Sequence, residues 1–165
     1  MSHKFLPMIV VSASDRRRLG RLVSSAMSDG HSVASFLAQE LARAEVVPDG
    51  SDELQSVVTM GSCVSYSLNW GSPVEPRKLI YPDEYAPDQF HVSILFPLGA
   101  ALIGVKVGSR MPYSNAGWMH VVRVESVKRP APNVIRLLPP PGRSFAGREP
   151  SDGSGSSSRN RDNLQ

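Results

Sequence analysis

The chain has 165 residues, of which 41% are hydrophobic, with 14 prolines, 13 glycines and a formal net charge of +3 at pH 7. This length predicts one main domain with a core and many turns, while a single cysteine and four scattered histidines exclude an internal disulfide and argue against a zinc site. Residues 132–165 hold five arginines and three acidic residues, so they carry +2 of the net charge. The nearly neutral remainder argues against a broad nucleic-acid-binding surface.

Membrane insertion and secretion are not expected from this sequence. No apolar run approaches the roughly 20 residues of a membrane span. The N-terminus lacks an apolar region followed by a cleavage site, so it does not predict a secretion signal. We therefore expect a soluble cytoplasmic protein that makes no membrane contact.

Residues 1–47 predict an N-terminal segment or short strand followed by an antiparallel helical hairpin. Over residues 15–28 the apolar side chains follow one helical face, and Ser12 or Ser14 can cap the helix start. Asp29 and Gly30 break the pattern, Ser32 offers a second cap, and residues 33–44 repeat the helical spacing. Two helices of about 14 residues, each about 20 Å long, joined by so short a loop must fold back on each other.

The polar side of the first predicted helix carries four arginines: Arg16, Arg17, Arg18 and Arg21. Such charge runs are usually solvated, and the alternative is that they contact nucleic-acid phosphate or a protein partner. The hairpin itself is either an interaction arm or an element that packs its apolar stripes on the next domain. The sequence leaves both questions open.

A polar linker with proline and glycine precedes a second predicted domain, residues 54–130. Residues 90–109 have the highest apolar density and are predicted as its core, with a strand at 92–96, a turn at 97–99, a helix at 100–103, and glycine turns at 104 and 108. Strands are also expected at residues 57–59, 63–70, 76–81 and 118–127, with a loop at 110–117. This order predicts an α+β fold in which one short helix covers a small antiparallel sheet.

The remaining residues, 131–165, are rich in proline, serine, glycine and arginine. Burial of so few apolar side chains cannot offset the entropy lost on ordering. We predict that this tail is largely disordered.

Five segments carry a resemblance to a known family: LAQELARAEVV, VVTMGSCVSYSL, KLIYPDEY, VSILFPLGAALIGVKVGS and MHVVRVESV. Over residues 9–128 the chain resembles the Rnk family, the regulators of nucleoside diphosphate kinase, which are relatives of the transcript-cleavage factors GreA and GreB. The resemblance implies an FKBP-like GreA/GreB C-terminal domain and a hairpin that is a shortened Gre coiled coil. It also implies binding to RNA polymerase at the mouth of the secondary channel, with DNA or RNA contacted only within that complex.

The end of the hairpin distinguishes this chain from the cleavage factors it resembles. Gre factors present two acidic side chains three residues apart, which help to hold a second Mg²⁺ at the polymerase centre. Here Asp29 is followed three residues later by Ser32, and one carboxylate is a poor ligand for a hard cation. A hairpin of about 20 Å is also short for a polymerase channel. We therefore expect a non-catalytic regulator that competes with Gre-type factors without stimulating cleavage and affects the kinase indirectly, through transcription.

The resemblance points to two groups of residues for polymerase binding. One is the hairpin end, with Asp29 and His31, and the other is Phe96, Pro97 and Leu98, after the predicted core strand. In Gre relatives an acidic residue stands two positions before this proline, and here that position is Leu95. The alternatives are that Pro97 and Gly99 serve only turn geometry and that Phe96 belongs to the core.

Other functions have weaker support in the sequence. There is no glycine-rich phosphate loop, Cys63 lies in a predicted strand without a partner histidine signature, and the aromatic residues are too spread out for an isomerase pocket. We therefore expect no enzyme activity, no cofactor and no small-molecule substrate. The main alternative is a protein-interaction module with a different partner, such as the kinase itself.

Overall fold

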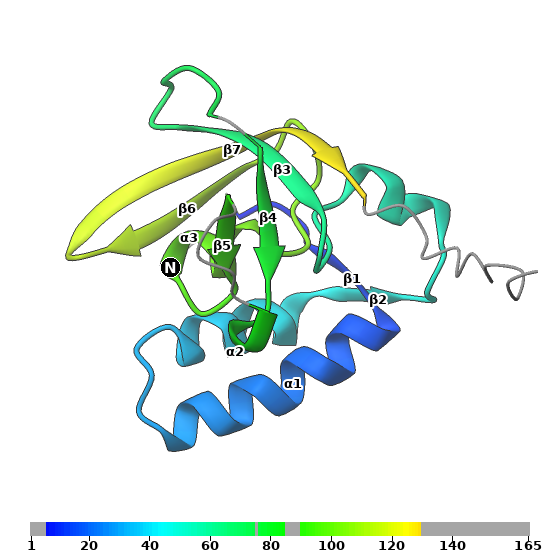
Figure 1. Ribbon diagram of the computed structural model, residues 1–165, viewed down its shortest axis with the longest axis vertical. Helices are drawn as coiled ribbons and strands as arrows, with labels where there is room; N and C mark the ends of the chain where they lie inside the picture. The colour runs from blue at the N-terminus through cyan, green and yellow to red at the C-terminus, as the bar shows by residue number, and fades with distance from the viewer. Residues whose placement is uncertain (1–5, 75, 85–89, 130–165) are drawn as a thin grey trace, which may run out of the picture. The chain divides into compact units, whose positions relative to one another are not determined.

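The computed structural model describes residues 6–74, 76–84 and 90–129, and the predicted tail, residues 131–165, lies outside this part of the chain (Figure 1). The first elements along the chain are β1 (Val10–Ser12), α1 (Ala13–Ser28), α2 (Ala34–Arg43) and β2 (Glu45–Val47). Strand β1 precedes the helical hairpin in the sequence and β2 follows it, and the two strands pair in parallel. The predicted cap Ser12 is confirmed, because its Oγ accepts a hydrogen bond from the N–H of Asp15 at 3.1 Å.

The second helix begins differently from the prediction. Val33 occupies the cap position of α2 and provides no side-chain hydrogen bond, so the predicted capping role of Ser32 was wrong. The loop backbone replaces a polar cap, because the N–H of Ala34 donates to the carbonyl of His31 at 3.1 Å. The helices are also unequal, with 16 residues in α1 and 10 in α2.

The rest of the chain forms a curled mixed sheet with one short α-helix. Its elements are η1 (Asp52–Ser56), β3 (Cys63–Leu68), β4 (Arg77–Ile80), η2 (Pro82–Glu84), β5 (His91–Ser93), α3 (Pro97–Leu102), β6 (Arg110–Asn115) and β7 (Trp118–Lys128). The strand order is β5-β4-β3-β7-β6. The α+β class is therefore confirmed, and the strand expected at residues 57–59 is reduced to a bridge between Val57 and Lys106.

The prediction of a wholly antiparallel sheet was wrong. Strands β4 and β5 run parallel, with Lys78 opposite His91 and Ile80 opposite Ser93, whereas the other neighbours are antiparallel. The connection from Ile80 to His91 is long enough to return the chain to the other end of β4, which a parallel neighbour requires. Strand direction depends on that crossover and not on the side-chain pattern of either strand.

Strand β6 replaces the loop expected at residues 110–117. It lies at the edge of the sheet and, among the described strands, pairs with β7 alone. Pro112 is tolerated within this strand because one side of an edge strand needs no N–H donor. Met111 and Tyr113 of β6 are buried in the core. The expected loop is reduced to a turn at Ala116 and Gly117, both of which have positive φ.

The predicted core stretch, residues 90–109, is confirmed as a centre of packing. Ile94, Ala101, Leu102 and Val105 are fully buried. The expected strand at 92–96 was too long, however, because the N–H of Phe96 turns back to the carbonyl of Ser93 at 3.0 Å. The predicted turn at 97–99 is instead the first turn of α3, with Pro97 at a position where a missing N–H has no cost.

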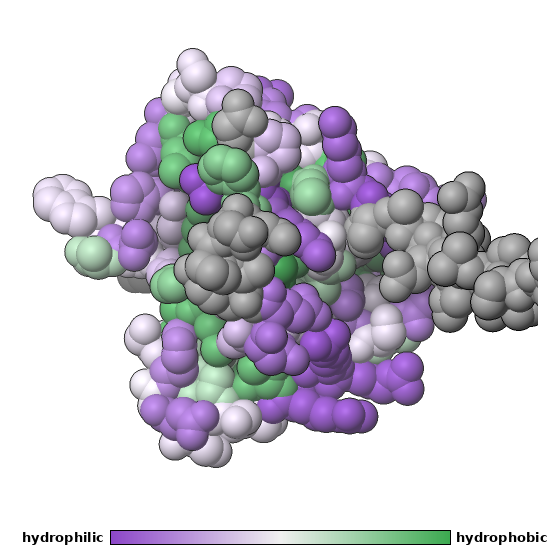
Figure 2. Space-filling view, viewed as in Figure 1, coloured by the Kyte–Doolittle hydropathy of each residue, from purple (hydrophilic) through white to green (hydrophobic). Residues whose placement is uncertain are grey.

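The helical hairpin and the sheet share one hydrophobic core. Leu19 of α1 and Leu37 of α2 belong to the same buried cluster as Leu79, Ile94 and Met111 of the sheet domain. Figure 1 shows both helices running alongside the sheet, and Figure 2 shows hydrophobic side chains between them. The hairpin therefore packs on the domain, and none of the described helices is long and apolar enough to cross a membrane.

A groove at the end of the hairpin

Pro97, one of the five predicted binding residues, lines a groove, which we call the tip groove. The end of the helical hairpin, the start of α3 and the end of β6 enclose a cavity of about 370 Å³. It is lined by Ser32, Val33, Phe36, Pro97, Tyr113, Ser114, Asn115 and Ala116. The groove thus joins segments that lie far apart in the sequence.

Three of the predicted residues surround the start of α3. Phe96 is 62% exposed, Pro97 lines the tip groove, and Leu98 is half-buried against the core. The alternative that Phe96 belongs to the core was therefore wrong. The strand ends at Ser93, so strand alternation no longer determines the side on which Phe96 lies.

Gly99 holds α3 against the preceding strand. A Cβ atom added at this position would lie 2.0 Å from the carbonyl oxygen of Ser93 and 3.1 Å from the Cα of Ile94. Only a residue without a side chain fits such a contact with backbone. Steric crowding therefore requires glycine at this position.

The other predicted residues lie on the hairpin end, residues 29–33, where the backbone is well hydrogen-bonded. Asp29 and His31 are exposed and do not line the tip groove, whereas Ser32 and Val33 do. The N–H of Asp29 donates to Ser25 at 3.0 Å, and that of His31 donates to Ala26 at 2.8 Å. Asp29 is the single carboxylate of this loop.

The basic side of α1 is partly engaged within the chain. The guanidinium of Arg18 lies 3.6 Å from the ring centroid of Tyr81 and 3.3 Å from the Glu84 carboxylate. Arg17 and Arg21 are exposed, and Figure 2 shows hydrophilic residues gathered over α1 at the lower right of the view. Arg18 therefore ties α1 to the sheet domain and is not a free phosphate ligand.

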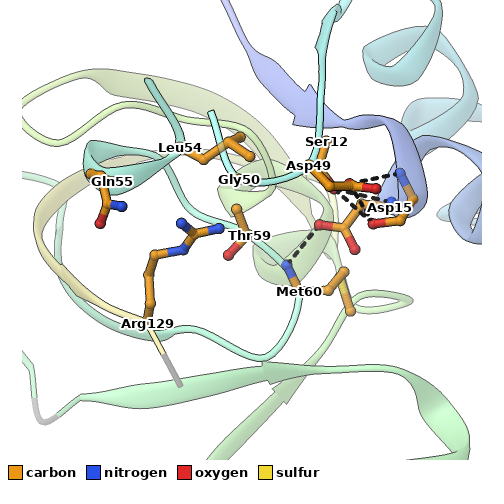
Figure 3. Close-up of a pocket in the computed structure, with 10 residues that line it drawn as sticks. Ser12, Asp15, Asp49, Gly50, Leu54, Gln55, Thr59, Met60 and Arg129 are labelled. Carbon is orange, nitrogen blue, oxygen red and sulfur yellow. Dashed lines mark hydrogen bonds between the residues drawn. The ribbon is translucent and has the colours of Figure 1, made fainter. Parts of the chain in front are cut away.

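A second, more polar cavity of about 540 Å³ lies where α1 begins (Figure 3). Burial raises the pKa of Asp15 above its ordinary value, while hydrogen bonds from Met60 and Ser12 oppose this rise. Asp49 accepts hydrogen bonds from the hydroxyl and the N–H of Ser14, at 2.7 Å and 3.1 Å, and these bonds lower its pKa. The sequence interpretation missed both acids, whose contacts tie the linker to the start of α1.

Metal chemistry has no evident centre in the part of the chain that the structure describes. Within residues 6–74, 76–84 and 90–129, no group of three or more His, Cys, Asp or Glu side chains could hold a metal ion. The candidate functional site is the tip groove, which Pro97 lines, together with the exposed residues Phe96, Asp29 and His31.

Comparison with known proteins first defines the class. Residues 53–129 match the family model of the transcription elongation factor GreA/GreB C-terminal domain, and residues 7–47 match that of the Rnk N-terminus. A solved GreA/GreB factor from Nitrosomonas europaea is 31% identical, with a TM-score of 0.59, over 74% of this chain and 98% of that structure. The fold is therefore that of a regulator resembling transcription elongation factors.

The particular family follows from curated relatives. The chain is 30% identical over 112 residues to the regulator of nucleoside diphosphate kinase from Escherichia coli, across 67% of this chain and 81% of the relative. The protein of the same name from Shigella flexneri matches equally well. This chain belongs to the Rnk family, as the sequence motifs indicated.

Proposed function

We propose that this chain is a non-catalytic regulator of transcription that binds RNA polymerase near the secondary channel and competes with Gre-type factors without stimulating transcript cleavage. One observation carries the proposal: in a chain with a GreA/GreB-type domain, the exposed hairpin end holds a single carboxylate, Asp29. Any effect on nucleoside diphosphate kinase is then indirect and follows from altered transcription.

The absence of cleavage follows from the ligand chemistry of the hairpin end. A second Mg²⁺ at a polymerase centre needs hard oxygen ligands, and two nearby carboxylates supply them better than one. Ser32 occupies the position three residues after Asp29, and its neutral hydroxyl cannot compensate the charge of the cation. The hairpin end can therefore occupy space near the channel without assembling a metal site.

The packing of the hairpin supports a role in obstructing the mouth of the secondary channel and not deep insertion of the hairpin into it. Helix α2 has 10 residues, which corresponds to about 15 Å of helix. Leu37 and Leu41 hold this helix in the common core, and Arg43 at its end donates a hydrogen bond to the carbonyl of Pro7. A hairpin held along its length in this way projects little beyond the domain.

The polymerase-binding residues of the proposal are Phe96, Pro97 and Leu98 at the start of α3, with Asp29 and His31 on the hairpin end. Exposed Phe96 provides apolar area that folding leaves uncovered, and such aromatic residues often dominate the energy of an interface. The tip groove between the two groups accepts a protruding side chain of the polymerase. Nucleic acid is contacted only within the complex, in the cytoplasm, and no cofactor or small-molecule substrate takes part.

The test is equilibrium binding of the full chain to core RNA polymerase, with a Gre factor added as competitor. Mutually exclusive binding is expected, and Phe96→Ala should weaken binding by about tenfold or more, as for a hot-spot residue. Phe90→Ala is the control, because Phe90 is similarly exposed, at 65%, but lies outside the proposed site. No binding to polymerase, together with binding to purified nucleoside diphosphate kinase, would instead favour a direct kinase partner.

A further inference from the structure

A strained turn after β3 holds an exposed tryptophan in place. Asn69 and Trp70 both have positive φ, of 47° and 62°, and the N–H of Gly71 closes the turn on the carbonyl of Leu68 at 2.8 Å. Turns with two positive φ values favour glycine at the second central position. Trp70 is nevertheless 74% exposed, so little packing in the folded chain offsets the cost of that conformation.

The turn is fixed to strand β7. The N–H of Asn69 donates to the carbonyl of Val121, and its side-chain oxygen accepts from the N–H of Val121, both at 2.9 Å. Its amide nitrogen lies 3.1 Å from Nδ1 of His120. These contacts orient the turn, so Trp70 is presented in a defined position beside β7.

Two arginines flank this tryptophan. The guanidinium of Arg110 lies 5.9 Å from the Trp70 ring centroid, and Trp70, Arg110 and Arg123 line one cavity of about 120 Å³. That volume is below the range of about 300–1,000 Å³ typical of small-molecule pockets. The cavity therefore suits a single side chain of a macromolecular partner better than a free ligand.

The charges of this face indicate the side chain that it accepts. The Glu125 carboxylate is already occupied, because it accepts a hydrogen bond from Ser67 at 2.7 Å and lies 3.7 Å from Arg123. Arg110 has no ion pair within the described part of the chain. A carboxylate from a partner would complement Arg110 and the exposed side of Arg123.

The apolar residues nearby favour protein over nucleic acid as the partner. Val121 and the 70% exposed Met119 share the outer face of β7 with Arg123, since alternate residues of a strand point the same way. Tryptophan, methionine and arginine are the residue types enriched in protein interfaces. Two arginines beside one glutamate are a small positive charge for phosphate binding.

We propose that Trp70, Arg110 and Arg123 form a second docking site, which receives a carboxylate-bearing protein segment of RNA polymerase on the outer face of the sheet. This inference rests on the proposed polymerase binding. The site is distinct from the tip groove, which is formed by the hairpin end, the start of α3 and the end of β6.

The Trp70→Gly variant separates a docking role from a structural one. Glycine adopts positive φ without strain, so the thermal midpoint should equal or exceed that of the original chain. Binding to core RNA polymerase should nevertheless weaken by at least about tenfold. A clearly lower midpoint would mean that Trp70 stabilises the fold, and it would overturn the proposal.

Matched variants and a nucleic-acid probe complete the test. Arg110→Ala should also weaken polymerase binding, whereas Phe90→Ala should not, although Phe90 too lies near an arginine, with Arg77 5.7 Å from its ring. Polymerase binding that is unchanged by Trp70→Gly would overturn this inference alone, and no binding by the original chain would overturn the proposed function as well. Loss of binding only to a labelled single-stranded RNA would assign the face to nucleic acid.

Discussion

Gly99 in the first turn of α3 and Gly30 in the hairpin end stand on the two sides of the tip groove and are required for different reasons. Gly99 has ordinary backbone angles but no room for a Cβ atom, which would meet the carbonyl oxygen of Ser93 at 2.0 Å. Gly30 has nothing within 4 Å of its added Cβ, but its φ is +70°. The α3 side of the groove is thus fixed by packing and the hairpin side by local backbone conformation.

The largest effect is expected for Gly99→Ala. The added methyl group must displace backbone, which costs about 3 kcal/mol of unfolding free energy when a packed region cannot adjust. Chemical denaturation of the full chain measures this loss. A loss below about 1 kcal/mol would show that α3 moves easily relative to β5, and the α3 side of the groove would then not be rigid.

Gly20→Ala is the matched control for that measurement. Gly20 lies inside α1, and its added Cβ would meet only the flexible end of Arg16, at 3.4 Å. Alanine should therefore stabilise the helix by about 0.5–1 kcal/mol. Opposite signs for these two glycine substitutions would confirm that space, and not chain entropy, decides the effect at Gly99.

A smaller loss is expected for Gly30→Ala. The cost of placing alanine in a left-handed conformation is about 1 kcal/mol, and no steric term adds to it because the site is open. The same denaturation measurement applies, with Gly30→Asn expected to cost less because asparagine tolerates this region better. Equal losses for Gly30→Ala and Gly99→Ala would remove the distinction between the two sides of the groove.

These two sides also differ in how well the sequence predicted them. The hairpin end follows from local signals, because helical spacing stops at Asp29 and Gly30. The predicted start of α3, at residue 100, was three residues too late, since Pro97 fits both a turn and a first helical position. The tip groove itself could not be foreseen, because it depends on β6, whose Pro112 resembles a loop residue until its edge position is known.

The features that the sequence did not predict share a physical cause. The orientation of Phe96 depends on where β5 stops, and the parallel pairing of β5 with β4 depends on a crossover. Asp49 reaches the start of α1 only because the linker returns there, where Ser14 donates two hydrogen bonds to its carboxylate. Apolar density, in contrast, was enough to identify residues 90–109, because this stretch contains an unbroken run of buried residues, 99–105.

The two acids beside α1 should give opposite dependences of stability on pH. The pKa of Asp15 in the folded chain is raised above 3.8, so its contribution falls as pH rises from 3.8 through the raised value. The pKa of Asp49 is lowered below 3.8, so its contribution to stability is lost as pH falls from 3.8 through the lowered value. Both effects should be smaller than those of the glycine substitutions, since the Asp15 carboxyl group is only partly buried and that of Asp49 is exposed.

Asp15→Asn and Asp49→Asn test this pair by denaturation over a series of pH values. Relative to the original chain, Asp15→Asn should gain stability from acidic to neutral pH, because it lacks the ionised buried group. Asp49→Asn should lose stability over the same interval, because a neutral amide accepts the Ser14 hydrogen bonds less strongly. If the stability of both variants, relative to the original chain, changed with pH in the same direction, the opposite pKa shifts of Asp15 and Asp49 would be contradicted.

Asp29→Ala should have the smallest effect of all on stability, within about 0.5 kcal/mol, because the side chain is exposed on the hairpin end. In a backtracked RNA polymerase complex with Mg²⁺, neither the original chain nor this variant should stimulate transcript cleavage, whereas a Gre factor added as positive control should. The Ser32→Asp variant sharpens the test, since it places a second carboxylate three residues from Asp29. If one carboxylate were enough to stimulate cleavage, the original chain would stimulate it and Asp29→Ala would not. If reach also limits the hairpin, Ser32→Asp will remain inactive, because the short α2 is held in the common core by Leu37 and Leu41.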